Sequence, residues 1–276
     1  MISPRSATPH VGLRERLDNG ERIIGTFVFS PDPAHSEIAA RAGFDFVIVD
    51  TEHAALSAKN VLDHVRAGKL AGADVIARLR TGSPADIGRL LDTGVDGLVH
   101  PHAGLGHTST IDALSAMRYP PSGGRPTCTG TRSAEYGLGD FQSLAAEADS
   151  RLVSVGLVED VTAVERVDEI ASLGFDVLIP GAADLAAAYG VPGQLTHPNV
   201  VDAIDRVHAA AARAGLHSGV YVRSGEEAQR WLDRGVSMVI ASIDYRVLAQ
   251  AYASLAAGFR PNVKPDSDQR RQETVA

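Results

Sequence analysis

Acidic, basic and histidine residues stand at the ends of short apolar runs along the chain. Asp50 ends the run FVIVD, His53 follows three residues later, and Arg78 ends the next run. Glu159 and Asp184 follow two later runs. Hard divalent cations such as Mg²⁺ and Mn²⁺ prefer carboxylate oxygens together with water and substrate oxygens. The pattern predicts an open metal site at Glu159 and Asp184, with His53 as a general base.

Other interpretations of the same residues exist. Each acid could cap a helix or pair with an arginine, and a lone histidine is more often structural than catalytic. His100 and His102 form an H-x-H pair that would suit zinc. A barrel hydrolase with such a pair also needs a lysine and further histidines on later strands, where this chain has Glu159 and Asp184. Several polar residues at one end of the fold favour the carboxylate site.

Lysine is scarce, and this restricts the chemistry. Of 26 basic residues only Lys59, Lys69 and Lys264 are lysines. Lys59 and Lys69 fall in a predicted helix and Lys264 in the C-terminal tail. Schiff-base aldolases need a desolvated lysine inside the barrel. The sequence therefore predicts that a metal, and not a lysine, stabilises any enolate.

The apolar runs alternate with helical patterns that have apolar residues at i, i+3 and i+4. Segments such as AGF, LGFD and AGLHS place Gly after a helix and before the next run, where a left-handed cap belongs. The runs are continuously apolar, as in strands buried on both faces. The predicted strands are Ile23–Phe29, Phe46–Asp50, Asp74–Arg78, Gly97–His100, Leu152–Glu159, Val177–Pro180, His217–Val222 and Met238–Ser242.

Eight βα units in about 250 residues predict an α/β fold, a TIM (β/α)8 barrel, with its active site at the carboxyl ends of the strands. A doubly wound sheet is disfavoured by this count and by the lack of a GxGxxG or Walker A motif. We predict one barrel domain over residues 13–260, with disordered ends at 1–12 and 261–276. The connection Arg118–Asp140 is long and rich in Gly, Pro, Ser and Thr, which indicates a functional or interface role.

Composition excludes several classes of function. The chain has 276 residues, a net charge of −8 and a pI near 5.7, which argues against nucleic acid as a partner. No apolar run is long enough to span a membrane, and the N-terminus lacks the apolar core of a signal peptide. With Cys128 as its one cysteine, the chain cannot form an internal disulfide. We predict a cytoplasmic enzyme.

Four segments carry a resemblance to the HpcH/HpaI aldolase family, whose members include 4-hydroxy-2-oxoheptanedioate aldolase and 2-keto-3-deoxy-sugar-acid aldolases. They are AGFDFVIVDTEHA (Ala42–Ala54), RYPPSGGR (Arg118–Arg125), LVE ending at Glu159, and GAADLA (Gly181–Ala186). The similarity spans residues 25–259. It implies a phosphoenolpyruvate/pyruvate-enolate type barrel and class II, metal-dependent cleavage of a 4-hydroxy-2-oxo acid to pyruvate and an aldehyde.

The resemblance also implies roles for single residues. Glu159 and Asp184 match the metal ligands, for Mg²⁺, Mn²⁺ or Co²⁺. His53 matches the base that acts on the substrate hydroxyl, and Arg78 matches the residue that stabilises the enolate. The remaining implied roles are Asp92 raising the basicity of the histidine, Asp50 orienting Arg78 or His53, and Ala183 and Asp184 receiving the pyruvate carboxylate. Gly181, which has no side chain, leaves room for the carboxylate to approach.

The chain departs from the family pattern at some positions. Leu157 replaces a Gln that contacts the bound 2-oxo acid, and the turn GPADLS is here GAADLA. Tyr221 falls where an aliphatic side chain commonly lines the pocket. Losing a polar contact costs about 1 kcal/mol when water can replace it. We therefore expect the enolate chemistry to be retained and the substrate scope to be shifted.

Partners and alternatives follow from the same resemblance. The expected substrates are a 2-oxo acid, pyruvate or oxaloacetate, and an aldehyde. Relatives form trimers or hexamers with the last helix packed on a neighbour, so a homo-oligomer is expected. The main alternative is oxaloacetate decarboxylation with addition of the enolate, as in macrophomate synthase, and a CoA-thioester lyase is a weaker one. A non-catalytic scaffold barrel is a third.

Overall fold

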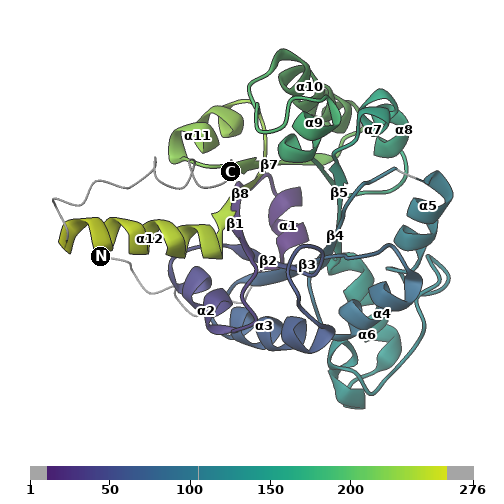
Figure 1. Ribbon diagram of the computed structural model, residues 1–276. Helices are drawn as coiled ribbons and strands as arrows, with labels where there is room; N and C mark the ends of the chain where they lie inside the picture. The colour runs from purple at the N-terminus through teal and green to yellow at the C-terminus, as the bar shows by residue number, and fades with distance from the viewer. Residues whose placement is uncertain (1–10, 105, 260–276) are drawn as a thin grey trace, which may run out of the picture.

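Eight parallel strands form a closed barrel in the computed structural model, which describes residues 11–104 and 106–259. Each strand pairs with the next, and β8 closes on β1 (Figure 1). This confirms the predicted barrel, and each predicted strand agrees to within one residue at either end. The strands are β1 (Ile23–Val28), β2 (Phe46–Asp50), β3 (Asp74–Arg78), β4 (Gly97–His100), β5 (Val153–Val158), β6 (Val177–Pro180), β7 (His217–Val222) and β8 (Met238–Ile243).

Helices follow every strand, and most of them cover the outer face of the barrel. The first helix precedes β1, and the connections after β4, β5 and β6 each contain two helices. A 3-10 turn, η1 (Arg132–Gly137), lies between α5 and α6. The helices are α1 (Leu13–Asp18), α2 (Ala34–Arg41), α3 (Ala58–Leu70), α4 (Pro84–Asp92), α5 (His107–Ser115), α6 (Phe141–Arg151), α7 (Val161–Glu165), α8 (Val167–Ala171), α9 (Ala182–Ala188), α10 (Pro198–Arg213), α11 (Gly225–Asp233) and α12 (Asp244–Phe259).

The apolar runs become strands because both of their faces are covered. Alternate residues, such as Ile48 and Val155, fill the barrel interior. Their neighbours, such as Val47 and Val49, pack under the surrounding helices. Gly43 and Gly174, with φ of 105° and 106°, end the helical segments before β2 and β6, as the sequence predicted.

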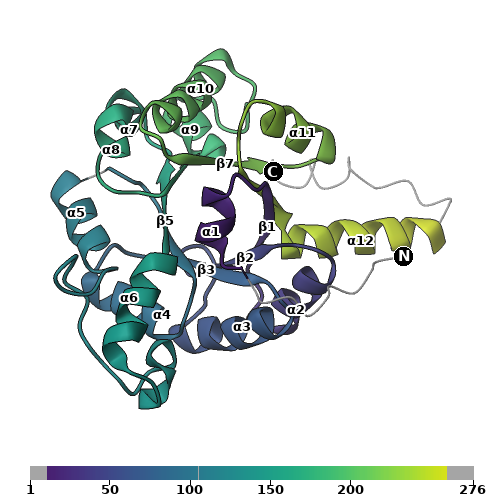
Figure 2. The same cartoon turned by 180° about the vertical axis from the view of Figure 1, so that it is seen from behind.

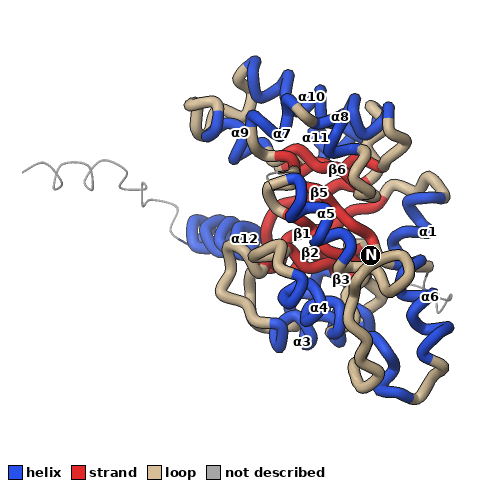
Figure 3. Tube along the Cα trace, turned by 90° about the vertical axis from the view of Figure 1, so that its right-hand side faces the viewer, coloured by secondary structure: helices blue, strands red, loops and turns tan. Residues whose placement is uncertain are grey.

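The two ends of the barrel differ. We call the end at which the strands start the floor and the end at which they finish the mouth. Helix α1 closes the floor, because Leu13 and Leu17 insert into the interior cluster (Figure 2). Arg16 pairs with Asp45, one residue before β2. In the side view, α1 and α6 lie at the floor and α9 and α12 lie toward the mouth (Figure 3).

Helix α12 is an exception to the layered arrangement. It leaves β8 and projects away from the barrel (Figures 1 and 2), and none of its residues is buried. Ile24, on the outer face of β1, is 41% exposed as a result. The apolar side chains of α12 that are exposed are Tyr245, Val247, Leu248, Tyr252, Leu255 and Phe259.

The predicted disordered ends lie outside the described residues, apart from Val11 and Gly12, and Gly12 forms the N-cap of α1. The long Arg118–Asp140 connection lies at the floor, where Arg132 contacts Gly94 just before β4. Among the described residues no helix is long and apolar enough to cross a membrane.

Candidate active site

Polar side chains from five consecutive strands meet at the mouth. Strand β2 ends at Asp50 and β3 at Arg78, and these two residues are register partners. His102 follows β4, Glu159 follows β5, and Asp184 lies in the first turn of the helix after β6. Because all strands are parallel, their carboxyl ends share one face of the barrel, which is where catalytic groups of this fold gather.

Asp50 organises the β2–β3 side of the mouth. Its side chain is fully buried, and its Oδ2 accepts a hydrogen bond from Arg78 Nη2. Its Oδ1 accepts the backbone N–H groups of Glu52 at 2.9 Å and His53 at 2.7 Å. Arg78 also lies over the Phe27 ring, 4.9 Å from the ring centre. One carboxylate therefore holds both the guanidinium and the loop that carries the predicted base.

His53 lies at the rim, and its imidazole is exposed to solvent. Its side chain is 59% exposed, and its Nε2 is 3.8 Å from Glu52 Oε2. Glu52 in turn lies 3.3 Å from Arg78 Nε. Glu52 therefore connects the exposed histidine to the buried Asp50–Arg78 pair.

Glu159 is the most deeply buried acid at the mouth that has no arginine or lysine partner among the described residues. It is 3% exposed, and its Oε1 accepts the backbone N–H of His102 at 2.8 Å. Burial, together with the nearby charge of Asp184, raises the pKa of Glu159 to about 7, although the His102 N–H acts to lower it. A buried carboxylate of this kind gains most from a cation beside it.

Gly181 is required by the position of Glu159. A Cβ at residue 181 would lie 2.5 Å from the Glu159 Cβ and 2.7 Å from its Oε2. Gly181 starts α9, and no side chain caps the first turn of that helix. Ala183 and Asp184, in this turn, are exposed at the mouth.

The donor set fits a hard divalent cation. The described residues contain no group of three or more His, Cys, Asp or Glu side chains that could hold a metal. Two carboxylates, one of them buried, leave coordination positions for water and substrate, which suits Mg²⁺, Mn²⁺ or Co²⁺ better than a structural zinc site. Glu159 and Asp184 are the residues that would hold such an ion.

His102 belongs to the site, and the sequence analysis did not assign it a role there. Its Nδ1 lies 3.0 Å from Asp160 Oδ2 and 3.6 Å from Glu159 Oε1. Its backbone has a φ of 49°, a conformation that bulky residues rarely adopt. Burial alone would lower the pKa of His102, but Asp160 and Glu159 raise it above its ordinary value. The signal in the sequence was the H-x-H pair at the exit of a strand.

The H-x-H pair does not converge on one ion. His100 points into the helix layer, where its Nε2 is 3.2 Å from Met117 Sδ and its ring meets the edge of Phe175. Burial lowers the pKa of His100 to about 4. In a regular strand residues 100 and 102 would share one face, but the left-handed turn at His102 directs its side chain to Glu159 and Asp160. His100 and His102 therefore do not form a joint zinc site.

Within one chain Asp92 lies away from His53, and the role that the resemblance implies for it stays a prediction. It is the last residue of α4, and its Oδ1 pairs with Arg125 Nη2 at 3.2 Å. Helix α4 runs from the mouth to the floor, and nine residues span about 13 Å at 1.5 Å per residue. Arg125 belongs to the long connection at the floor, so that connection is also distant from the mouth within one chain.

Leu157 and Tyr221 lie inside the barrel, below the mouth. Leu157 is buried in the interior cluster, and Tyr221 packs against the same cluster. The Tyr221 hydroxyl accepts a hydrogen bond of 3.0 Å from Arg246 Nη1. The barrel interior below the mouth is thus apolar at position 157 and carries one hydroxyl from β7.

Comparison with known proteins agrees with this geometry. The sequence matches the HpcH/HpaI aldolase/citrate lyase family over residues 23–251. It is 32% identical to a pyruvate aldolase of Rhizobium etli, over 90% of this chain and 96% of the relative. It is 31% identical to a 4-hydroxy-2-oxovalerate aldolase of Rhodococcus jostii, over 91% and 97%. An HpcH/HpaI aldolase structure from Desulfitobacterium hafniense superposes with a TM-score of 0.82 at 28% identity, covering 92% of this chain and 98% of that one.

Proposed function

Because the chain belongs to the HpcH/HpaI aldolase/citrate lyase family and is a carbon–carbon lyase, we propose that it cleaves a 4-hydroxy-2-oxo acid to pyruvate and an aldehyde, or joins the two in reverse. The observation that carries the proposal is the buried Glu159 beside Asp184, close to an Asp50–Arg78 pair at the same mouth. Such a site can hold a divalent cation and stabilise a developing oxyanion.

Glu159 and Asp184 hold the cation in this proposal. When bound, the cation supplies a Lewis acid that stabilises negative charge on the 2-oxo group. The raised pKa of Glu159 supports this role, because a buried carboxylate with a pKa near 7 is ionised more readily when a cation lies beside it. Gly181 leaves room for Glu159 and for the substrate carboxylate at the same point.

Arg78 stabilises the enolate oxygen that forms when the C3–C4 bond breaks. Asp50 holds the guanidinium in place, so no reorganisation is needed as charge develops. The Phe27 ring supports the opposite face of the guanidinium. The guanidinium of Arg78 supplies a fixed positive charge in this step.

His53 is the general base of the cleavage. It takes the proton of the C4 hydroxyl, the C3–C4 electron pair moves into the enolate, and the aldehyde leaves. Protonation at C3 then yields pyruvate. The Asp50 carboxylate fixes the His53 backbone, which supports this role, while the exposed imidazole leaves space for the substrate hydroxyl.

The first turn of α9 receives the carboxylate of the 2-oxo acid. Its backbone N–H groups at Ala183 and Asp184 are not capped by a side chain. Leu157 and Tyr221 line the inner wall beneath the bound acid. Leu157 offers no hydrogen bond to the substrate. We therefore propose that the carboxylate and keto oxygens of the acid are held on the side away from Leu157, by the first turn of α9 and by the cation.

Metal-dependent release of pyruvate from a 4-hydroxy-2-oxo acid tests the proposed function. We expect release with Mg²⁺, Mn²⁺ or Co²⁺ and loss of release on chelation. Calorimetric titration of the metal with and without pyruvate gives a second readout. A protein that binds no metal in either condition would be a scaffold. One that decarboxylates oxaloacetate but cleaves no hydroxy-oxo acid would instead belong with the enolate-adding decarboxylases.

We further propose that the protein is a homo-oligomer, a trimer or hexamer, in which α12 packs on another copy. The support is the unburied apolar side of α12 together with the uncovered Ile24 on β1. Contiguous exposed apolar surface of this kind marks an interface. Light scattering at micromolar concentration should give a multiple of 29.0 kDa. A Tyr252→Glu, Leu255→Glu variant should be smaller, and a monomeric unmodified protein would contradict the proposal.

A further inference from the structure

Tyr221 is the last inward-facing residue of β7 and brings a hydroxyl to the mouth of the barrel. Its ring packs against the interior cluster, whereas its neighbours along β7 pack against side chains of α11. The register of β5, β6 and β7 makes Tyr221 the counterpart of Gly181, and Gly181 the counterpart of Glu159. The hydroxyl therefore comes from the same level of the barrel as the buried carboxylate, two strands away.

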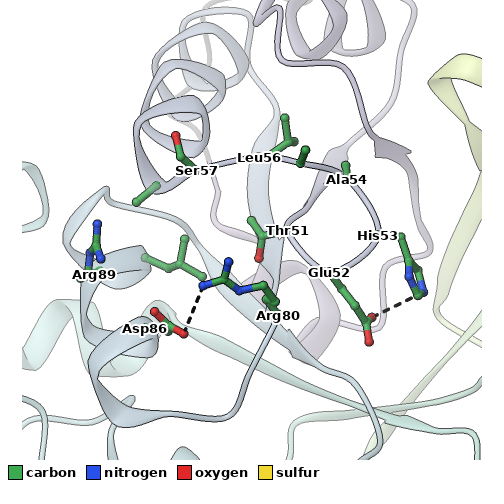
Figure 4. Close-up of a pocket in the computed structure, with 12 residues that line it drawn as sticks. Thr51, Glu52, His53, Ala54, Leu56, Ser57, Arg80, Asp86 and Arg89 are labelled. Atoms are coloured by element: carbon green, nitrogen blue, oxygen red, sulfur yellow. Dashed lines mark ion pairs between the residues drawn. The ribbon is translucent and has the colours of Figure 1, made fainter.

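The proposed binding mode turns C3 of the 2-oxo acid toward the arc formed by β7, β8 and β1. The three substituents of C2 lie in one plane. The carboxylate faces α9 after β6 and the oxygen faces Arg78 at the end of β3, so C3 points to the remaining arc. His53 lies beyond this arc, on the β2–α3 loop beside Glu52 (Figure 4). Tyr221 has a hydroxyl, whereas Phe27 and Ile240, in the interior cluster on the same arc, have none.

Arg246, in the first turn of α12, binds the Tyr221 hydroxyl. Its Nη1 donates to the hydroxyl oxygen at 3.0 Å. An oxygen that accepts a hydrogen bond keeps its own O–H proton for donation. Among the described residues no group accepts that proton, and no carboxylate pairs with Arg246. The hydroxyl is thus oriented by a positive charge, and its proton is available to a bound molecule.

The start of α12 is fixed, and this fixes Arg246. Asp244, the first residue of the helix, accepts the backbone N–H groups of Phe29 and Ser30, just after β1, at 3.0 and 3.1 Å. Ser242 has a φ of 62°, a left-handed conformation that is unfavourable for a residue with a side chain. Such strain persists where the surrounding contacts enforce it, and it is common at functional sites. The strained turn lets Arg246 reach back to β7 while the rest of α12 leaves the barrel.

We propose that Tyr221 is the acid that protonates C3 of the pyruvate enolate and that Arg246 positions its hydroxyl. The inference rests on the proposed aldolase function and assigns the proton donor that the cleavage requires. The Tyr221 O–H bond breaks, the enolate electron pair forms the C3–H bond, and the C2 carbonyl is restored. The phenolate beside the Arg246 guanidinium then takes a proton from water. In carboligation the same phenolate removes a methyl proton from pyruvate.

Exchange of the pyruvate methyl protons with deuterated water, followed by NMR with Mn²⁺ or Mg²⁺ present, tests the donor directly. Tyr221→Phe should lower the exchange rate about 100-fold or more, the usual contribution of a positioned acid. The Phe ring still fills the interior cluster, so the melting temperature and the calorimetric affinity for metal and pyruvate should be unchanged. Tyr252→Phe is the matched control, because Tyr252 lies on α12 and is 63% exposed. It should exchange at the rate of the unmodified protein.

Trapping of the enolate separates protonation from bond cleavage. Hexacyanoferrate(III) oxidises enolates, so during cleavage of a 4-hydroxy-2-oxo acid it competes with the proton donor. In Tyr221→Phe the enolate still forms but is protonated slowly. The ratio of hexacyanoferrate(III) reduced to pyruvate released should therefore rise at least about 10-fold over the unmodified protein. A lower cleavage rate with an unchanged ratio would mean that Tyr221 acts before the C3–C4 bond breaks, and it would overturn the assignment.

Arg246 variants test the positioning role. Arg246→Gln should lower kcat for methyl exchange about 10-fold, since a hydrogen bond to a charged group is worth about one decade. The KM for pyruvate should stay the same, and Arg246→Lys should restore part of the rate. In the Tyr221→Phe background Arg246→Gln should have no further effect, because Arg246 acts through the hydroxyl. Fully additive losses in the double variant would contradict this role.

The unmodified protein and Tyr221→Phe together distinguish the two levels of the proposal. If both exchange the methyl protons at the same rate, the donor is wrong and the aldolase function stands. If the unmodified protein shows no exchange with metal present, the proposed function fails, and this inference fails with it.

Discussion

Three carboxylates at the floor of the barrel and the carboxylate of Glu159 at the mouth have opposite surroundings. At the floor, Asp45 and Asp176 stand just before β2 and β6. Each accepts a backbone N–H of the preceding strand, and each pairs with an arginine of α1. Asp96 repeats the pattern with Val75 and Lys69, although burial and the neighbouring Asp74 raise its pKa to about 6. At the mouth, Glu159 is buried and no described arginine or lysine pairs with it.

The difference separates acids that hold the fold from an acid that is available to a ligand. The floor carboxylates Asp45 and Asp176 have arginine partners in the folded protein, which stabilise their charge. Glu159 has a single backbone N–H and the histidine of a strained turn beside it. Burying charge without a full set of partners is unfavourable and persists at sites that bind something. The comparison predicts that mouth substitutions change activity and that floor substitutions change stability.

Glu159→Gln should have the largest effect. We expect pyruvate formation to fall by about 10³-fold or more, because the cation loses a charged ligand whose Lewis-acid assistance is worth several kcal/mol. The Gln carbonyl can still accept the His102 N–H, and a buried charge is removed, so the melting temperature without metal should stay equal or rise. A variant that lost stability as well would place Glu159 with the floor carboxylates.

His53→Ala should lower kcat by about 10²- to 10⁴-fold, the usual contribution of a positioned base. The side chain is 59% exposed and its anchoring hydrogen bond is made by the backbone, so unfolding should occur at the same temperature. Deuterium exchange into pyruvate does not require removal of a C4 hydroxyl proton and provides a second measurement. Full cleavage activity in this variant would refute the assignment of His53 as the base.

His100 extends the comparison to a residue that is two positions from the site but faces the helix layer. Burial lowers its pKa from 6.5 to about 4, so below pH 6.5 the unfolded chain takes up a proton that the folded chain does not. The contribution of His100 to the free energy of unfolding should therefore fall by about 3 kcal/mol as the pH drops from about 6.5 to 4, since one pKa unit corresponds to about 1.4 kcal/mol.

Denaturant titrations across this pH range measure the effect. His100→Leu should remove its part of the slope, and the part due to His208, whose pKa burial also lowers to about 4, should remain. Above pH 6.5 neither histidine contributes to the slope. An unchanged slope in the Leu variant would mean that His100 titrates normally in the folded protein.

Asp176→Asn should have the smallest effect, on stability alone. The Asn oxygen can keep one acceptor role, but the pairs with Arg14 at 2.7 Å and Arg118 at 3.5 Å lose their charge. We expect a loss of about 1–3 kcal/mol in the free energy of unfolding. The kcat of the folded fraction should match the unmodified protein, and a drop in kcat at unchanged stability would break the floor–mouth division.

Much of the fold could be predicted because its signals are local. The run FVIVD is apolar on both faces, and a glycine with left-handed backbone precedes it, so β2 was located to the residue. His102 was harder to interpret, because its direction depends on a left-handed turn that brings it to Glu159 on the next strand. The partner of Asp92 could not be predicted either, because Arg125 lies 33 residues further along the chain.

By itself the sequence determined the barrel, the class of chemistry and the strand ends that carry its polar groups. Periodicity and residue type report local structure, and the scarcity of lysine needs no coordinates. Only the tertiary structure decided how far each of these groups is buried and what it contacts. It separated Glu159, which burial leaves at a pKa of about 7, from the floor acids that pair with arginines. Burial and pairing depend on residues distant in the chain, and no local pattern encodes them.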